Sequence, residues 1–276
     1  MDGDAPASRR HTITPRSPEF EYADLPRNWM GGNPFGTHIA NGANLLFPSG
    51  ERFFIRSVRF FADRITDPEL RAQVKAFYAQ EARHGAAHQR QFEVLRAQGY
   101  DVDSFLRAYD RLAWDKLEPA FSPELRLAVT AALEHYTAIM AEGALGYGAL
   151  DIAHPKMKQL LLWHACEEIE HKAVAFDVLK AVAPSYATRL AGMTLATLGL
   201  AAFWVAATVT LLRQDRAAGR PLTLQQLRET GDDRRSIARD VFWRGFREYL
   251  RPDFHPMQND NLRLARDYLA SVGLAT

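Results

Sequence analysis

Two copies of the pattern Glu-x-x-His contain residues whose types and spacing could bind a metal. Glu81 stands three positions before His84, and Glu168 stands three positions before His171. On a helix, this spacing places one oxygen donor and one nitrogen donor on adjacent turns of the same face. The two patterns therefore predict a metal site built from two helices.

Both patterns lie on helix faces that are otherwise apolar. At spacings of three and four, the neighbours are Val74, Phe77, Phe92 and Leu95 for the first pattern and Met157, Leu161, Ala175 and Val178 for the second. Such faces turn toward the core, where an isolated carboxylate is costly unless it is protonated, paired or bound to a cation. No Lys or Arg lies near the middle of either face, so a metal is the simplest neutralising partner.

Two further helices supply acidic candidates. Glu134 shares a face with apolar residues, and Glu51 follows a Pro-Ser-Gly sequence. An acidic residue in a first helical turn is also favourable to the helix dipole, which leaves a second interpretation for Glu51. Two Glu-x-x-His helices and one Glu from each of two others form the ligand set of di-iron bundles. Four glutamates would balance two divalent ions. This donor set suits iron or manganese, and the single cysteine, Cys166, excludes a thiolate cage.

Other polar residues near these patterns have weaker assignments. His164 stands four positions before Glu168, which makes it an added ligand or, alternatively, an outer-shell or core histidine. His88 is expected to support the ligands from outside, and Glu142 to cap the cavity. The residues that fall off the apolar faces are expected at the surface or around the ligands; they are His135, Glu167 and Glu170.

Helix start and stop signals predict an all-α fold. The sequences Asp67-Pro68-Glu69 and Ser122-Pro123-Glu124 each begin a long helix, which ends near Gly99 and Gly148 respectively. Further helices are expected over Pro155–Pro184, Ser49–Arg64 and Ser104–Leu117. No stretch alternates as a strand does. We expect a ferritin-like four-helix bundle with a dimetal centre over residues 33–185, a mobile arm over 1–32, and extra C-terminal helices over 186–276.

The C-terminal region contains a strongly apolar segment. No charged residue occurs from Leu190 to Leu212, which is long enough to cross a bilayer. A helix buried in the bundle and a homodimer interface remain alternatives. The segment Ile237–Arg251 interleaves arginines with aromatic residues, so it is expected to lie in a membrane interface or to cap the bundle.

Composition excludes several classes of function. The 276 residues carry a formal net charge of +1, so no global field attracts nucleic acid. The N-terminus lacks the apolar run of a secretory signal. A single cysteine permits no intramolecular disulfide and suits a reducing compartment. We therefore expect a cytoplasmic protein, with association with the cytoplasmic membrane left open by the apolar segment.

The sequence resembles a bacterial family labelled "predicted metal-dependent hydrolase", whose members are thought to be ferritin-like. The likeness rests on Pro48-x-Gly-Glu-Arg-Phe-Phe54 and both Glu-x-x-His patterns, and it covers about Asn33 to Pro252. The pattern is also similar to di-iron aminoarene N-oxygenases, in which an additional His precedes the last Glu-x-x-His. These resemblances imply as ligands Glu51, Glu81, His84, Glu134, His164, Glu168 and His171. The apolar Leu190–Leu212 segment departs from those soluble oxygenases.

Three functions follow from such a centre. The preferred one is oxidation of a small apolar organic substrate by O2, because buried Glu-x-x-His bundles usually serve oxygen chemistry. The second is two-metal hydrolysis, and the third is metal storage with ferroxidase activity. The four glutamates Glu51, Glu81, Glu134 and Glu168 would be both ligands and catalytic residues.

Overall fold

The computed structural model describes residues 11–229 and 242–275, and over these ranges the chain is helical. An isolated β-bridge joins Met30 to Ala153 in these ranges. The prediction of an all-α fold with a long apolar helix is confirmed for this part of the chain. The helices are α1 Pro34–Arg59, η1 Ala62–Arg64, α2 Pro68–Ala97, α3 Val102–Leu112, η2 Ala113–Leu117, η3 Glu118–Ala120, α4 Pro123–Gly146, α5 Pro155–His171, α6 Val174–Val182, α7 Tyr186–Ala217, α8 Leu224–Glu229, α10 Arg244–Tyr249, η5 Pro256–Gln258 and α11 Leu262–Ser271.

The predicted helix starts have the expected capping bonds. The side chain of Asp67 accepts hydrogen bonds from the backbone N–H groups of Glu69 and Leu70 at the start of α2. Ser122 accepts one from Leu125 at the start of α4. Each cap satisfies donors that the first helical turn leaves unpaired, and the proline that follows lacks such a donor. Local chemistry therefore fixes where these two helices begin.

The prediction was wrong about the start of α1. This helix begins at Pro34, where Asn33 accepts a hydrogen bond from Gly36, and it continues through Pro48. A proline inside a helix costs about 3 kcal/mol because it removes one hydrogen bond. Buried side chains on both sides of it, such as Leu45 and Phe53, offset that cost by packing. A Pro-Ser-Gly sequence that resembles a turn is therefore helical in its tertiary context.

The helix expected from Pro155 to Pro184 is divided in two. α5 ends at His171 and α6 begins at Val174, although no Gly or Pro marks the break. Of the helix expected over Ile237–Arg251, residues 237–241 lie outside the described residues, and α10 covers the following part.

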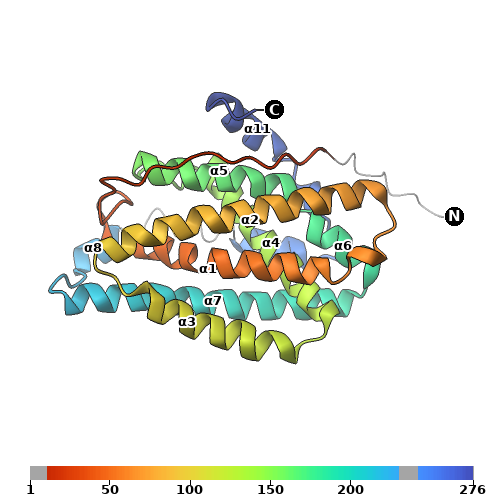
Figure 1. The fold of residues 1–276 in the computed structure, drawn as a ribbon, viewed down its shortest axis with the longest axis horizontal. Coiled ribbons are helices and arrows are strands. Elements are labelled where there is room, and N and C mark those ends of the chain that lie inside the picture. The colour runs from red at the N-terminus through yellow and green to blue at the C-terminus, as the bar shows by residue number, and fades with distance from the viewer. Residues whose placement is uncertain (1–10, 230–241, 276) are drawn as a thin grey trace.

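The long helices lie side by side along the long axis of the molecule (Figure 1). α1 packs against α2 and α7, and α4 packs against α5 and α7. Two glycines allow α7 to approach closely. A Cβ atom at Gly192 would lie 2.5 Å from the backbone of Ala128 in α4, and one at Gly42 would lie 2.6 Å from Thr208 of α7. The apolar helix α7 is therefore docked on the bundle.

By length and composition α7 could also cross a membrane. Only 22% of its most apolar stretch of 18 residues is buried. The large core cluster lies among α1, α2, α4, α6 and α7. A membrane-crossing helix and a docked helix can have the same composition. The contacts of α7 with α1 and α4, and not its hydropathy, show that it is docked in this structure.

The segment before α1, which we expected as a mobile arm, lies against the bundle from residue 11 onward. Ile13, Trp29 and Met30 are buried. The carbonyl oxygen of His11 accepts a hydrogen bond from Gln73 of α2. Figure 1 shows this chain running along α5 and α2. Hydrogen bonds and burial thus hold the described part of the segment in place.

Candidate metal centre

The seven residues predicted as ligands meet inside the bundle. α1 provides Glu51, α2 provides Glu81 and His84, α4 provides Glu134, and α5 provides the remaining three. Each is at most 4% exposed: Glu51, Glu81, His84, Glu134, His164, Glu168 and His171. The structure therefore brings together every residue that the sequence patterns singled out as a ligand.

Glu168 and Glu81 lie between the imidazoles of the two patterns. The Oε1 atom of Glu168 is 3.6 Å from His84 Nδ1 and 3.5 Å from His171 Nε2. The Oε1 atom of Glu81 is 3.8 Å and 3.1 Å from the same two nitrogens. Each of these two carboxylates therefore lies within reach of both imidazoles, and both would help to hold metal ions there.

The other three candidates divide between the two sides. Glu134 Oε2 is 3.3 Å from His171 Nε2. Glu51 Oε1 is 3.7 Å from His164 Nε2, and that nitrogen is 2.8 Å from Glu168 Oε1. One side of the cluster thus contains Glu134 and His171. The other side contains Glu51, His84 and His164.

The donor atoms fit metal ions because many of them have no hydrogen-bond partner among the described residues. Both carboxylate oxygens of Glu51, Glu81 and Glu134 are buried without one. His84 Nδ1 and His171 Nε2 are also buried without a hydrogen-bond partner. Donor atoms of Glu51, Glu81 and His84 form one group of three within 4.8 Å of one another, and those of Glu81, Glu168 and His171 form another. So many buried acceptors without a hydrogen-bond partner are costly to the folded protein. A cation bound among them would satisfy them.

The electrostatics of the centre also favour a cation. Burial, together with neighbouring carboxylates, raises the pKa of Glu51 and of Glu81 well above its usual range. Burial raises the pKa of Glu134 to about 7. Burial also disfavours the charge of Glu168, but His171 and His164 hold its pKa well below normal. The histidines carry too little positive charge to neutralise all four carboxylates. Two divalent ions would supply the missing charge.

The residue that precedes the glutamate of one pattern contacts the histidine of the other pattern from outside. His84 Nε2 lies 3.0 Å from Glu167 Oε2, and His171 Nδ1 lies 2.9 Å from Gln80 Oε1. These contacts leave His84 Nδ1 and His171 Nε2 directed at the carboxylates. Outer partners of this kind fix the ring orientation and raise the basicity of the ligand. Gln80 was missed from the sequence, and its position just before Glu81, matching Glu167 before Glu168, was the available signal.

Arg16 connects Glu167 and the neighbouring Glu170 to the N-terminal segment. Its guanidinium donates to both oxygens of Glu170 at 2.9 Å, and its backbone N–H donates to Glu167 at 3.0 Å. Gln80 also donates to Glu170. No sequence pattern pointed to Arg16, because it lies far along the chain from every candidate ligand. Glu167 and Glu170 are buried around the ligands, which is one of the two positions expected for them.

His88 contacts His164: its Nε2 lies 2.7 Å from His164 Nδ1, and the other ring nitrogen of His164 faces the carboxylates. His88 also forms a group of three possible ligands with Glu51 and His164, so its outer position stays a prediction. Glu142 was expected to cap the cavity, and that prediction was wrong. It bonds instead to Arg244, Asn259 and Asn261, because the C-terminal segment supplies donors there.

His135 lies away from the centre and contacts the C-terminal part of the chain. Its Nε2 lies 2.8 Å from the carbonyl oxygen of Gly245. Burial lowers the pKa of this histidine to about 4. His135 therefore packs between α4 and α10. It lies neither at the surface nor around the candidate ligands, the two positions that we expected for it.

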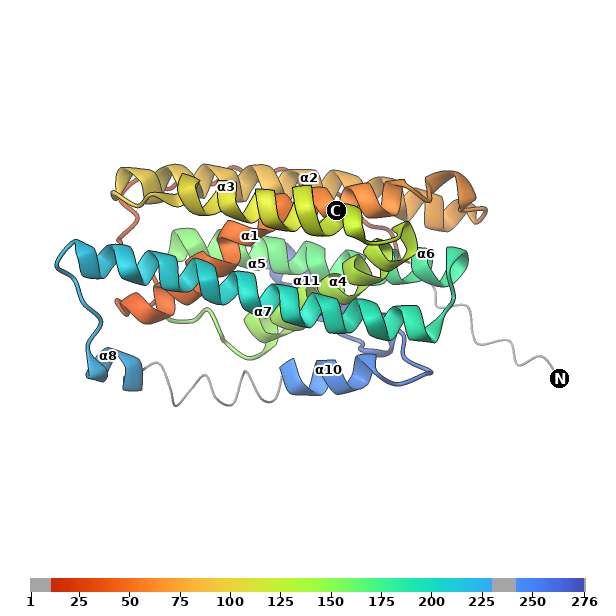
Figure 2. The same ribbon diagram turned by 90° about the horizontal axis from the view of Figure 1, so that it is seen from below.

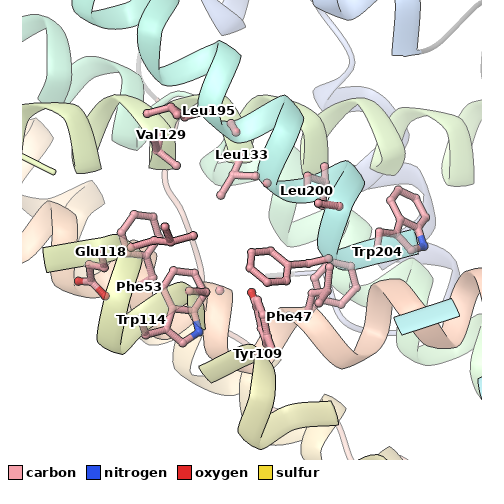
Figure 3. Close-up of a pocket in the computed structure, with 18 of the residues that line it drawn as sticks. Phe47, Phe53, Tyr109, Trp114, Glu118, Val129, Leu133, Leu195, Leu200 and Trp204 are labelled. Carbon is pink, nitrogen blue, oxygen red and sulfur yellow. The ribbon is translucent and has the colours of Figure 1, made fainter. Parts of the chain in front are cut away.

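A large apolar cavity reaches the centre from the side of α7. Its volume is ≈ 620 Å³, and Glu51 is among the residues that line it. Figure 3 shows that its walls carry Phe47, Phe53, Tyr109, Trp114, Val129, Leu133, Leu195, Leu200 and Trp204. The described lining residues include no Lys, Arg or His. A second cavity of ≈ 400 Å³ is lined by His164 and Glu168, with Phe47 and Trp204 contributing to both.

A comparison with protein families gives one match, to the family described as "Predicted metal-dependent hydrolase", over residues 14–260. No curated protein and no solved structure matches the chain significantly. The matched range contains all seven candidate ligands and Arg16. The ferritin-like relationship of the bundle stays a prediction. The chain, with its buried cluster of Glu and His residues, belongs to this family of predicted metal-dependent hydrolases.

Proposed function

We propose that the protein is a dinuclear metal enzyme, with iron preferred over manganese, that oxidises an apolar organic substrate with O2. The observation that carries this proposal is the meeting of a carboxylate-rich donor cluster with a large apolar cavity at Glu51. Four glutamates and three histidines from four helices resemble the ligand sets of di-iron bundles. A pair of Fe²⁺ ions bound there would supply two of the four electrons that reduce O2, and the substrate would supply the other two.

The residues of the chain would hold and insulate this chemistry. Glu81 and Glu168 would help to hold the ions, since each lies near both His84 and His171. Gln80 and Glu167 would keep the two imidazoles in orientation. Because each carboxylate has two oxygens, its binding mode can change with the charge of the ions while the helices stay fixed. Burial of all these groups excludes water, which would otherwise compete for reactive species.

The larger cavity supports an apolar substrate. Apart from Glu51, Glu118 and Thr137, its walls are apolar or aromatic, and the described lining residues include no cation to bind a phosphate or a carboxylate group. A molecule in this cavity would approach the centre beside Glu51 and Phe47. The ring of Phe47 lies 4.9 Å from that of His164, so a bound substrate would be adjacent to the ligands. We therefore propose an apolar, uncharged substrate.

Hydrolysis is the second candidate, and the description of the family favours it. Two ions would then share a hydroxide and polarise an ester or amide. The described residues of the cavity walls offer no Lys, Arg or His to a charged group of a substrate held away from the ions. An apolar ester remains compatible with the cavity. Metal storage is the third candidate, and it would require uptake of iron beyond the ions that the donor cluster can hold.

Metal content tests the centre itself. We expect about two ions per chain after expression with iron, and loss of both in Glu168→Gln. Glu142→Gln is the matched control, because Glu142 is also buried but bonds to Arg244 outside the centre. Retention of both ions by Glu168→Gln would contradict the ligand assignment. Uptake of many ions per chain would instead support storage.

Oxygen uptake tests the reaction class. The protein would be loaded with Fe²⁺ without oxygen, mixed with buffer containing oxygen, and followed with an oxygen electrode and by optical absorption. We expect rapid consumption of O2 that depends on Glu168 and gives oxidised product from long-chain alkyl or aromatic compounds. An absence of O2 consumption, together with cleavage of a long-chain p-nitrophenyl ester, would replace oxidation with hydrolysis.

A further inference from the structure

Many of the exposed large apolar side chains gather on the helices around α7. Among the residues on α3, η2, α7, α8 and the start of α10, they are Leu112, Leu117, Tyr186, Leu198, Val205, Leu224, Leu227 and Trp243. Figure 2 shows α7 running between α3 on one side and α8 and α10 on the other. Single exposed apolar groups are ordinary, but several on the elements around α7 make this side of the molecule a candidate interaction surface.

The outer side of α7 is an uncharged stripe. At spacings of three and four, its exposed residues are Ala187, Ala191, Thr194, Leu198, Ala201 or Ala202, and Val205. The 19 residues from Ala187 to Val205 extend about 27 Å at 1.5 Å per residue. Arg213 and Arg216 then follow, both exposed and without an ion pair among the described residues. We call the stripe and these two arginines the α7 face.

The mouth of the large cavity lies beside the α7 face. Leu112, Leu117 and Leu198 line the cavity, and they are also 50%, 42% and 64% exposed. A residue that is both exposed and part of a cavity wall stands at its opening. The cavity therefore opens between α3, η2 and α7, within the most apolar part of the described surface.

The inner side of α7 is fixed to the bundle by a buried polar group at its C-terminal end. Asp215, only 3% exposed, contacts His38 of α1 at 2.6 Å and accepts a hydrogen bond from Tyr100 at 2.8 Å. Arg220 donates to the same carboxylate. Separating α7 from the bundle would leave Asp215 and His38 without these partners, at the cost of a buried unsatisfied pair. α7 can thus offer its outer side to another surface only while it stays docked.

We propose that the α7 face binds the surface of an anionic lipid bilayer, with α7 lying in the plane of the interface. The uncharged stripe suits the apolar edge of a bilayer, and the two arginines at its end suit anionic headgroups. A second copy of the chain on the same face would cover the mouth of the cavity. A bilayer leaves the mouth open to molecules dissolved in its apolar layer. This last step rests on the proposed apolar substrate, whereas the binding to lipid does not.

Vesicle binding tests the proposal directly. The metal-loaded full chain would be sedimented with vesicles of phosphatidylcholine and phosphatidylglycerol. We expect binding by the wild type and at least a tenfold loss in Val205→Glu, because a charge replaces an apolar group in the interface. Val272→Glu is the matched control, since Val272 is 44% exposed but lies after α11, on the opposite side from α7 (Figure 1). No binding by the wild type, or equal loss in both variants, would overturn the proposal.

Two further measurements separate the remaining outcomes. Replacement of both Arg213 and Arg216 by Gln should weaken binding to anionic vesicles by about fivefold per arginine and leave binding to neutral vesicles unchanged. Analytical ultracentrifugation should give the same mass for the wild type and Val205→Glu. A dimer that only Val205→Glu dissociates, without vesicle binding by either, would identify the face as an interface between copies. Metal content, measured on the same samples, reports on the centre independently.

Discussion

The metal centre and the α7 face depart from the usual distribution of polarity in opposite directions. The centre places four carboxylates in the interior, where they are at most 3% exposed. The α7 face places Leu198 and Val205 at the surface, where they are 64% and 62% exposed. In both regions the chain by itself leaves groups in an unfavourable environment. Each region is therefore suited to a partner that the chain does not supply: cations in one case and a bilayer in the other.

The two regions differ in how strictly geometry defines them. The centre depends on single atoms from four helices that must meet within a few ångströms, and outer contacts such as that of Gln80 to His171 hold those atoms. The α7 face needs only a row of uncharged side chains on one helix. We expect a single substitution to abolish the function of the centre and several to be tolerated on the face. The four changes below test that contrast, from the largest effect to the smallest.

Glu81→Gln should have the largest effect. The amide keeps the size of the side chain but cannot carry the charge that holds a cation, so both ions should be lost on metal analysis. The metal-free variant should unfold at a higher temperature than the metal-free wild type, because one crowded buried carboxylate is gone. Glu142→Gln should instead lower the unfolding temperature, since it leaves Arg244 without its partner. Equal shifts in both variants would show that crowding of charge does not destabilise the centre.

Gly85→Ala should weaken metal binding by about 10–100-fold. A Cβ atom at Gly85 would lie 2.9 Å from Glu51 Oε2 and would displace that carboxylate. Calorimetric titration with Mn²⁺ measures the affinity. Gly50→Ala is the control, because its Cβ would meet nothing within 4 Å, and it should stabilise the helix by about 0.5–1 kcal/mol. Unchanged affinity in Gly85→Ala would remove Glu51 from the ligand set.

Arg16→Ala should weaken Mn²⁺ binding by about tenfold, less than a change in the centre itself. The substitution frees Glu170 and Glu167 from the N-terminal segment, so His84 loses part of its orientation. Arg27→Ala provides the comparison, because Arg27 lies in the same segment but bonds to Gln98, away from the centre. A similar loss of affinity in both variants would mean that the segment acts only through overall stability.

Thr194→Leu should have the smallest effect and the opposite sign. It adds apolar area to the α7 face, and about 1 kcal/mol of burial corresponds to about fivefold tighter binding to vesicles. The metal content should stay at the level of the wild type. Ser271→Leu at the end of α11 should leave vesicle binding unchanged. Tighter binding by both variants would point to general stickiness rather than to a defined face.

Local sequence patterns predicted much of the fold, and they failed where packing overrides them. The starts of α2 and α4 were correct because Asp67 and Ser122 cap them through short-range hydrogen bonds. The start of α1 was wrong because Pro48 is helical only in the presence of the neighbouring helices. The break after His171 has no sequence signal at all. Tertiary contacts, which a single stretch of sequence does not contain, decided both points.

The sequence by itself determined the candidate donors of the centre. Carboxylates and imidazoles on apolar helix faces are costly without a cation, so their spacing at Glu81, His84, Glu168 and His171 was sufficient to predict a metal site. Only the tertiary structure decided what surrounds them: Gln80 and Arg16 in the outer layer, and the cavity that α7 closes. Helical periodicity shows which residues share a face, but it contains no information about which faces meet.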